Sequence, residues 1–296
     1  MFQLDKTVKI RIVRNDGREF NIDGTDWRIP SKGLDGFGSY ENDITTVDNA
    51  VGDGGIVTSE RIAQKDRTIT AVSRNPYIND ILRKIVLAFF NAKATYKIYL
   101  TYMGVTRWCE GKLHRFDLPT ANVNRTMTMT MTFLCASPYL KSYDDFGQNI
   151  ASVLGMCGFP YLCNMNGADR IPQGITGGRF NFAQLITLEN DGDVETFCKA
   201  VFTAKGEVIN PKFIVNNNYV RVIDTLQEGD VIVMDFSNNP PTVQKNGVNF
   251  IGHCDRTSAF DDMALVVGDS VIQFDADSGS NLLDVSIYYN KLYAAI

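Results

Sequence analysis

Short segments of alternating apolar and polar residues recur about every ten residues from residue 179 to residue 296. Turn signals separate them, for example Asn190-Asp191-Gly192, Glu228-Gly229 and Asn246-Gly247. Such a series predicts a β-sandwich of the jelly-roll type. The segments predicted to be strands are 179–189, 195–204, 212–215, 219–224, 230–236, 242–245, 264–267, 270–274 and 283–289.

Residues 1–140 predict a second β-rich, sandwich-like domain. Its clearest strand is 125–134, in which threonines alternate with Met127, Met129, Met131 and Phe133. This alternation is typical of a half-buried antiparallel strand, and it leaves open whether the threonine face contacts another subunit. The other predicted strands are 7–13, 67–72, 96–102 and 107–116, whereas 24–55 is predicted to be a glycine-rich loop.

One helix is predicted, over about residues 76–91. Asn75 is a suitable N-cap, and Pro76 suits the first helical position because its missing N–H costs nothing there. The apolar residues that recur at helical spacing, and that we expect to face the core, are Ile78, Ile81, Leu82, Ile85 and Phe89.

The length of 296 residues suggests two domains, and the charge distribution agrees. Residues 1–140 hold 19 Lys and Arg against 15 Asp and Glu, whereas residues 141–296 hold 10 against 19. Residues 141–178 are irregular and predict a loop-rich linker or the start of a second domain, which would then occupy 179–296. The net charge of −5 disfavours a general nucleic-acid-coating role.

No membrane anchor is expected. The longest apolar run, residues 85–90, is far shorter than the roughly 20 residues that cross a bilayer. The N-terminus alternates like a strand and lacks the continuous apolar stretch of a signal peptide. These features predict a protein made and kept on the cytosolic side of a cell, at least until release.

Histidine-based catalysis has few candidates, because the chain has two histidines. His114 lies in an alternating segment and is expected to be a half-exposed strand residue. His253-Cys254-Asp255 combines triad residue types, but adjacent residues of a strand point to opposite faces and could not share a proton. We therefore assign no catalytic residue and expect no enzymatic activity.

Metal and cofactor sites are also not expected. Cys157 and Cys163 are five residues apart, wider than the usual zinc spacing, and the six cysteines are expected to be reduced and mostly buried. The segment 275–281 departs from the EF-hand pattern and predicts a hairpin loop. The acidic pairs Asp261-Asp262 and Asp191-Gly192-Asp193 predict solvated turns. The glycine clusters lack the strand-then-helix context of a dinucleotide site.

Taken in order along the chain, these short motifs resemble the distal tail protein family of tailed bacteriophages. The motifs that carry the resemblance are Gly33–Gly38, Val51–Gly55, Arg67–Val72, Thr132–Tyr139, Asn190–Asp193, Ala204–Gly206, Asn210-Pro211, Glu228–Asp230, Asn246-Gly247, Ser258–Phe260 and Val285–Tyr289.

The resemblance implies a structural virion protein at the tail tip, assembled in the host cytoplasm. The N-terminal domain would form a hexameric ring, joined to the tail tube protein above and to the tail-associated baseplate hub protein below. The C-terminal domain would be a galectin-like sandwich that can hold a fibre or a receptor-binding protein. Within the ring, we expect the contacts in the 24–55 loop or the 96–116 hairpin, and complementary docking of the oppositely charged domains.

Two alternatives remain open from the residues alone. One is a carbohydrate-binding, lectin-like host-recognition protein, which would need exposed aromatic residues such as Tyr219, Tyr288 or Tyr289. The other is a hydrolase that uses His253 or the aspartate clusters.

Overall fold

The computed structural model describes residues 8–49, 52–120, 125–143, 146–149, 151–155, 178–182, 185–238 and 240–296. The chain divides into two compact units. Unit 1 comprises residues 1–144 and 291–296, and unit 2 comprises residues 145–290. This division differs from the expected one in that the last residues belong to unit 1, where β26 (Leu292–Tyr293) pairs with β11 (Leu140–Ser142).

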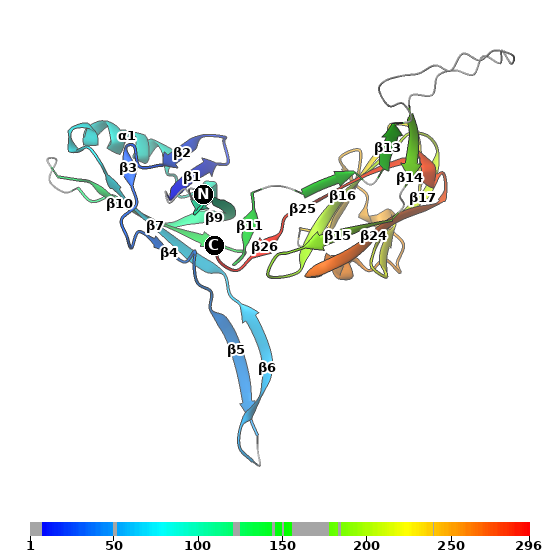
Figure 1. Cartoon of the computed structure of the whole chain (residues 1–296), viewed down its shortest axis with the longest axis horizontal. Helices are drawn as coiled ribbons and strands as arrows, with labels where there is room; N and C mark the ends of the chain where they lie inside the picture. Colours follow the sequence, from blue (N-terminus) through cyan, green and yellow to red (C-terminus); the bar gives the residue numbers. More distant parts are fainter. Residues whose placement is uncertain are drawn as a thin grey trace, which may run out of the picture. The chain divides into compact units, whose positions relative to one another are not determined.

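Unit 1 is built on one ten-stranded sheet in which all described pairings are antiparallel (Figure 1). The strand order is β2-β1-β8-β9-β10-β7-β3, and β4, β11 and β26 pair beside this path. The remaining strands of this sheet are β1 (Lys9–Arg14), β2 (Glu19–Ile22), β3 (Trp27–Arg28), β4 (Leu34–Asp35), β7 (Lys65–Ser73), β8 (Thr95–Tyr102), β9 (Val105–Asp117) and β10 (Thr128–Cys135).

The alternation predicted for β10 is confirmed. Met129, Met131 and Phe133 are fully buried in the core of unit 1. On the other face, the hydroxyls of Thr132 and Thr130 lie 3.0 and 3.4 Å from those of two threonines on β7. The threonine face is therefore a hydrogen-bonded ladder within the chain.

The predicted helix begins as a 3-10 turn, η1 (Pro76–Ile78), and continues as α1 (Asn79–Phe89). The Asn75 side chain accepts a hydrogen bond from the Tyr77 backbone nitrogen, as expected of an N-cap. The buried apolar residues of α1 are Leu82, Val86 and Phe89. The expectation that Ile81 and Ile85 face the core is wrong, because half of each side chain is exposed.

The prediction of a loop throughout residues 24–55 is also wrong. β5 (Asn42–Asp48) and β6 (Gly55–Ile62) form a two-stranded antiparallel hairpin that projects from the sheet of unit 1 (Figure 1). Gly52 and Gly54 adopt positive φ in its turn. The run Ile44-Thr45-Thr46-Val47 is rich in β-branched residues, and its strand preference is stronger than the surrounding glycines suggested.

Unit 2 is a β-sandwich. Its two main sheets have the orders β12-β25-β16-β20-β21-β22 and β15-β24-β17-β18, with β23 pairing β16, β19 pairing β17, and β13 and β14 paired separately. The strands are β12 (Phe146–Asn149), β13 (Ala151–Gly155), β14 (Gly178–Phe182), β15 (Leu185–Asn190), β16 (Thr196–Ala204), β17 (Val208–Val215), β18 (Asn218–Arg221), β19 (Thr225–Leu226), β20 (Val231–Asp235), β21 (Thr242–Lys245), β22 (Val248–Asn249), β23 (Ala264–Leu265), β24 (Gly268–Ser278) and β25 (Leu283–Tyr289).

One apolar core joins the two sheets of unit 2. Phe202 and Ile287 enter it from the first sheet, and Phe213 and Phe274 enter it from the second. Three 3-10 turns, η2 (Ile251–His253), η3 (Phe260–Asp262) and η4 (Ser280–Leu282), connect strands. The prediction of a mainly β chain with a C-terminal β-sandwich is confirmed. No helix within the described residues is long and apolar enough to cross a bilayer.

Candidate assembly surface

The hairpin β5–β6 exposes apolar residues that no other part of unit 1 covers among the residues the structure describes. All of β5 and seven of the eight residues of β6 are exposed. Ile44, Val47, Ile56 and Val57 are each more than half exposed, with Ile56 at 65%. An isolated two-stranded hairpin is marginally stable in water. This arm therefore has the properties of a segment that is stabilised by a partner.

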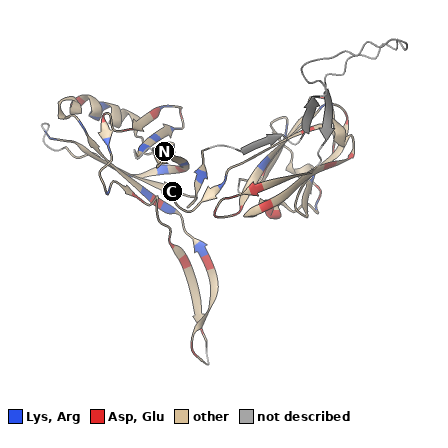
Figure 2. Cartoon of the chain, viewed as in Figure 1, with Lys and Arg blue, Asp and Glu red and all other residues tan. Residues whose placement is uncertain are grey.

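The hairpin is acidic, whereas the rest of the first 140 residues is basic. Residues 42–62 hold Asp43, Asp48, Asp53 and Glu60 against the single cation Arg61, a net charge of −3 (Figure 2). The remainder of residues 1–140 holds 18 Lys and Arg against 11 Asp and Glu, a net charge of +7. Electrostatic complementarity of this kind steers association between copies of one chain.

A second uncovered apolar surface lies on the outer side of the helix. Tyr77, Ile81 and Ile85 are spaced by four residues, so they form one stripe. Their exposures are 94%, 54% and 50%. Lys84 is exposed beside this stripe. A helix with apolar residues on both its inner and its outer face is usually buried on both, so the outer stripe indicates a contact with another molecule.

The C-terminal end of α1 is anchored by Arg14 of β1. Its guanidinium donates to the carbonyl oxygens of Phe89 at 2.8 Å and Ala88 at 3.3 Å, which have no partner within the helix. Asp16 pairs with this guanidinium and accepts from the Arg18 backbone nitrogen at 3.2 Å. The hydrogen bond from Arg14 lowers the pKa of Asp16 to about 2. A cation at this end also complements the helix dipole.

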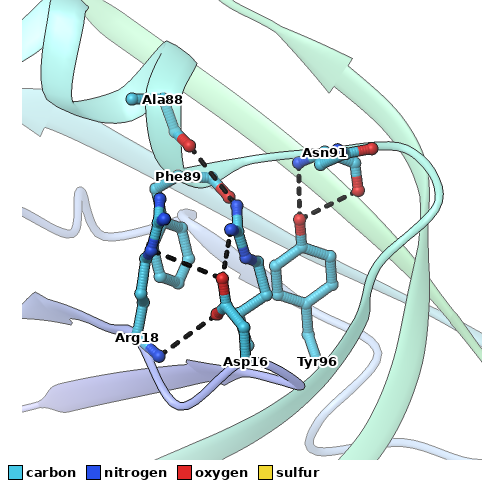
Figure 3. Close-up of polar contacts among 7 residues, drawn as sticks. Asp16, Arg18, Ala88, Phe89, Asn91 and Tyr96 are labelled. Carbon is cyan, nitrogen blue, oxygen red and sulfur yellow. Dashed lines mark hydrogen bonds and ion pairs between the residues drawn. The ribbon is translucent and has the colours of Figure 1, made fainter.

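The segment after the helix is held by Tyr96 of β8. Its hydroxyl donates to the Asn91 carbonyl at 2.9 Å and accepts from the Asn91 backbone nitrogen at 2.6 Å (Figure 3). Burial raises the pKa of Tyr96, and its ring packs near Phe89 and Phe133 in the core. Together with Arg14, this contact fixes which face of the helix is turned to solvent.

The glycine-rich segment that precedes the hairpin is anchored by Arg67 on β7. This arginine is fully buried and donates to the carbonyl oxygens of Gly36 at 3.3 Å and Pro138 at 2.5 Å. Gly36 has φ +80°, and a Cβ there would lie 2.4 Å from the Asp66 carbonyl oxygen. The glycine-rich stretch before the hairpin therefore packs tightly against β7.

Comparison with known proteins identifies the second unit. Residues 191–293 match the family model described as the C-terminal domain of the siphovirus-type tail component. Residues 191–293 form a siphovirus-type tail component domain. No curated protein matches the chain in sequence.

Solved structures resemble this chain in fold over nearly its whole length. The crystal structure of SPP1 Dit (gp 19.1), described as a paradigm of the hub adsorption apparatus in phages that infect Gram-positive bacteria, superposes with a TM-score of 0.63 at 10% identity, over 96% of this chain and 98% of that one. Chains of the phage P2 baseplate in its activated conformation, with Ca and with Sr, give TM-scores of 0.54 and 0.53 at 14% and 12% identity, each over 98% of this chain and 99% of that one. The resemblance to the distal tail protein family is confirmed, and the fold is that of phage tail and baseplate proteins.

The histidine candidates of this chain are engaged in structural contacts. His253 lies in the 3-10 turn η2 rather than on a strand, so the expected strand geometry is wrong, and its ring stacks on Phe250 at 3.9 Å. Burial raises the pKa of the neighbouring Cys254 thiol to about 11. The Asp255 carboxylate accepts from the Thr257 backbone nitrogen at 3.0 Å. His114 is exposed on β9 with its Nδ1 3.4 Å from the Asp66 carboxylate.

The acidic segment 275–281 is not the predicted hairpin loop, because β24 continues to Ser278. Asp277 accepts from the Asn210 side chain at 2.7 Å and pairs with Arg221. Asp261 and Asp262 lie in η3. Within the described ranges, no group of three or more His, Cys, Asp or Glu side chains is placed to hold a metal ion.

Of the cysteines, Cys109, Cys135 and Cys198 are buried and Cys254 is half-buried, all as free thiols. The Sγ atoms of Cys109 and Cys135 are 3.9 Å apart. The hydrogen bond between the two thiols lowers the pKa of Cys135 to about 7, and the same contact raises that of Cys109. Cys157 and Cys163 lie outside the described residues.

The three tyrosines considered for sugar binding do not form one platform. Tyr289 is buried at 6% exposure. Tyr219 lies on β18 beneath the Lys212 ammonium, which is 4.0 Å from its ring centre. Tyr288 is exposed but lies on β25, in the other sheet.

Proposed function

We propose that this chain is the hub protein of a phage tail tip, a structural virion protein without enzymatic activity or cofactor. Copies of unit 1 form a homohexameric ring that joins the tail tube protein above to the tail-associated baseplate protein below. Unit 2 carries a fibre or a receptor-binding protein. Assembly takes place in the host cytoplasm. The family match of unit 2 and the fold likeness of the whole chain support this role.

The observation that carries the ring is the pair of uncovered apolar surfaces on unit 1. A ring of identical subunits uses a head-to-tail contact, which joins two different patches of each subunit. The hairpin β5–β6 and the stripe Tyr77, Ile81, Ile85 are two such patches. The first strand of this hairpin falls within residues 24–55, one of the two regions that the sequence suggested for ring contacts, the other being the 96–116 hairpin.

Light scattering on the purified full-length chain tests the ring. Six copies of a 33.0 kDa chain give about 198 kDa, and we expect this species to form in a concentration-dependent way. A mass of 33.0 kDa at every concentration would overturn the ring. Replacing Tyr288, which is exposed on unit 2, with alanine is a matched control that should leave the mass unchanged.

A further inference from the structure

We infer that the hairpin β5–β6 of one copy lies across the outer face of α1 in the next copy. This inference rests on the proposed ring and names the two surfaces that meet. It requires that the two surfaces agree in side-chain chemistry, in length and in charge.

One face of the hairpin is suited to an apolar stripe. Ile44 and Thr46 point to the same side of β5, because side chains alternate along a strand. Opposite them on β6 are Glu60 and Val57, and Ile62 is opposite Asn42 on that side. This face therefore carries three aliphatic side chains and two carboxylates, Glu60 and, nearer the turn, Asp48. The aliphatic side chains lie outside the core of unit 1.

The lengths of the two surfaces match. The apolar face of the hairpin runs from Asn42 to Thr46 on β5, about 13 Å at roughly 3.3 Å per residue. Tyr77 in the turn η1 and Ile85 on α1 are eight positions apart, about 12 Å if each residue rises about 1.5 Å as in an α-helix. Ile44, Val57 and Ile62 can thus lie along Tyr77, Ile81 and Ile85 without leaving either surface partly covered.

The charges of the two surfaces are complementary. Glu60 shares the apolar face of the hairpin, and Lys84 is exposed next to Ile81 and Ile85 on the helix. Two hairpins would repel one another, because each carries a net charge of −3. In contrast, an acidic hairpin is attracted to the rest of residues 1–140 in another copy, because those residues carry a net positive charge.

Two other surfaces of unit 1 fit the hairpin less well. On the outer side of the sheet, the Lys97 and Lys141 ammonium groups lie 5.2 and 5.0 Å from the Trp108 ring centre, so these cations already contact a ring of their own chain. At the β8–β9 turn, Met103 and Val105 are about half exposed, but they belong to one tight turn and carry no charge. This turn serves as the comparison in the test.

Cysteine pairs test the contact directly. The variant Val57→Cys with Ile81→Cys, treated with a short bismaleimide, should give a ladder of cross-linked oligomers on a denaturing gel. Each single variant should give none, because the contact joins two different positions of neighbouring copies. The pair Val57→Cys with Val105→Cys should also give none. Wild-type protein reports any cross-linking through the native cysteines.

Charge exchange provides an independent readout. Glu60→Lys and Lys84→Glu should each raise the concentration for half-assembly a few-fold, as exposed ion pairs do when reversed. The double variant should restore the wild-type value. All five positions changed in the cross-linking and charge-exchange tests are exposed, so melting temperatures should stay close to wild type.

The outcomes separate this contact from the ring itself. The contact would be overturned if oligomers of about 198 kDa form but the 57–81 pair gives no ladder. A ladder with the 57–105 pair would also overturn it. Either result would leave the ring itself intact. A wild-type chain that remains at 33.0 kDa would overturn the ring as well.

Discussion

The Arg14 guanidinium donates to the Phe89 carbonyl oxygen at 2.8 Å, so a residue of the first strand closes the end of a helix 75 residues away. The final carbonyls of a helix need such partners. In this protein the contact also sets the orientation of the helix, and hence the exposure of Ile81 and Ile85.

Replacing Arg14 with methionine should lower the melting temperature of unit 1, because the Phe89 and Ala88 carbonyls lose their donor. Arg14→Lys should recover part of the loss, since lysine keeps the charge but not the forked donors. Calorimetry measures both variants. If Arg14→Met melts like wild type, the anchoring role of Arg14 is refuted.

Asp230 should make unit 2 sensitive to acid. Its carboxylate accepts from the Gln227 backbone nitrogen at 3.0 Å and the Asn246 side chain at 2.8 Å, and pairs with Lys245. These contacts lower the pKa of Asp230 to about 2, and the hydrogen bond from Gln227 has the largest effect. An aspartate in an unfolded chain has a pKa of about 3.9. Because the folded pKa is the lower one, this stabilisation is complete above about pH 4 and is lost as the pH falls toward 2.

The variant Asp230→Asn should therefore be less stable than wild type at neutral pH and should approach wild-type stability near pH 2. Unfolding by denaturant across this pH range measures the difference. Asp261→Asn, at an exposed position, is the control and should show no such convergence. A constant difference between Asp230→Asn and wild type at every pH would contradict the assignment.

Gly36→Ala should destabilise unit 1 by at least about 1–2 kcal/mol, the usual cost of a left-handed backbone for a residue with a side chain. The new methyl group would also lie 2.4 Å from the Asp66 carbonyl oxygen. Gly38→Ala is the matched control, because nothing lies within 4 Å of its Cβ position. Equal stability of the two variants would show that Gly36 is not required.

Core truncations should act on one unit each. Phe133→Ala removes a fully buried ring from unit 1, and Phe274→Ala removes one from unit 2. Each should cost about 3–5 kcal/mol in its own unit. Calorimetry should show the corresponding transition shifted to lower temperature and the other unchanged. A shift of both transitions by either variant would mean that the two units unfold together.

Much of the strand pattern could be predicted, because its local chemistry is unambiguous. Asn246 and Gly247 have φ of 51° and 81°, as an Asn-Gly hairpin turn requires, and the strand before them, β21, lies at the predicted residues 242–245. The two-residue strand after the turn, β22, was not predicted. The alternation around Met131 likewise identified the buried face of β10. Period-two patterns specify both the strand and its inner face, so these predictions needed no tertiary information.

The helix shows where sequence reasoning reaches its limit. Ile81 and Leu82 are adjacent and equally apolar, and each belongs to an apolar row along the helix. Spacing alone does not say which of the two rows faces the sheet. The core side was decided by tertiary contacts, including the Arg14 bond at the C-terminal end. The pairing of β26 with β11 was equally hidden, because it joins short strands about 150 residues apart in the chain.

The assembly surface could be found only in part. Residues 24–55 were one of two regions selected as ring-contact material, the other being the 96–116 hairpin. β5 lies within 24–55, but β6 extends to Ile62. The four exposed aliphatic residues of the hairpin resemble ordinary strand residues in sequence. Their significance depends on the absence of a covering layer in unit 1, which is a property of the fold.

Electron microscopy of the purified full-length chain tests the central claim most directly. Two-dimensional averages of the assembled species should show a closed six-fold ring with a central channel. Averages that show compact particles without a channel, or two-fold dimers, would contradict the account.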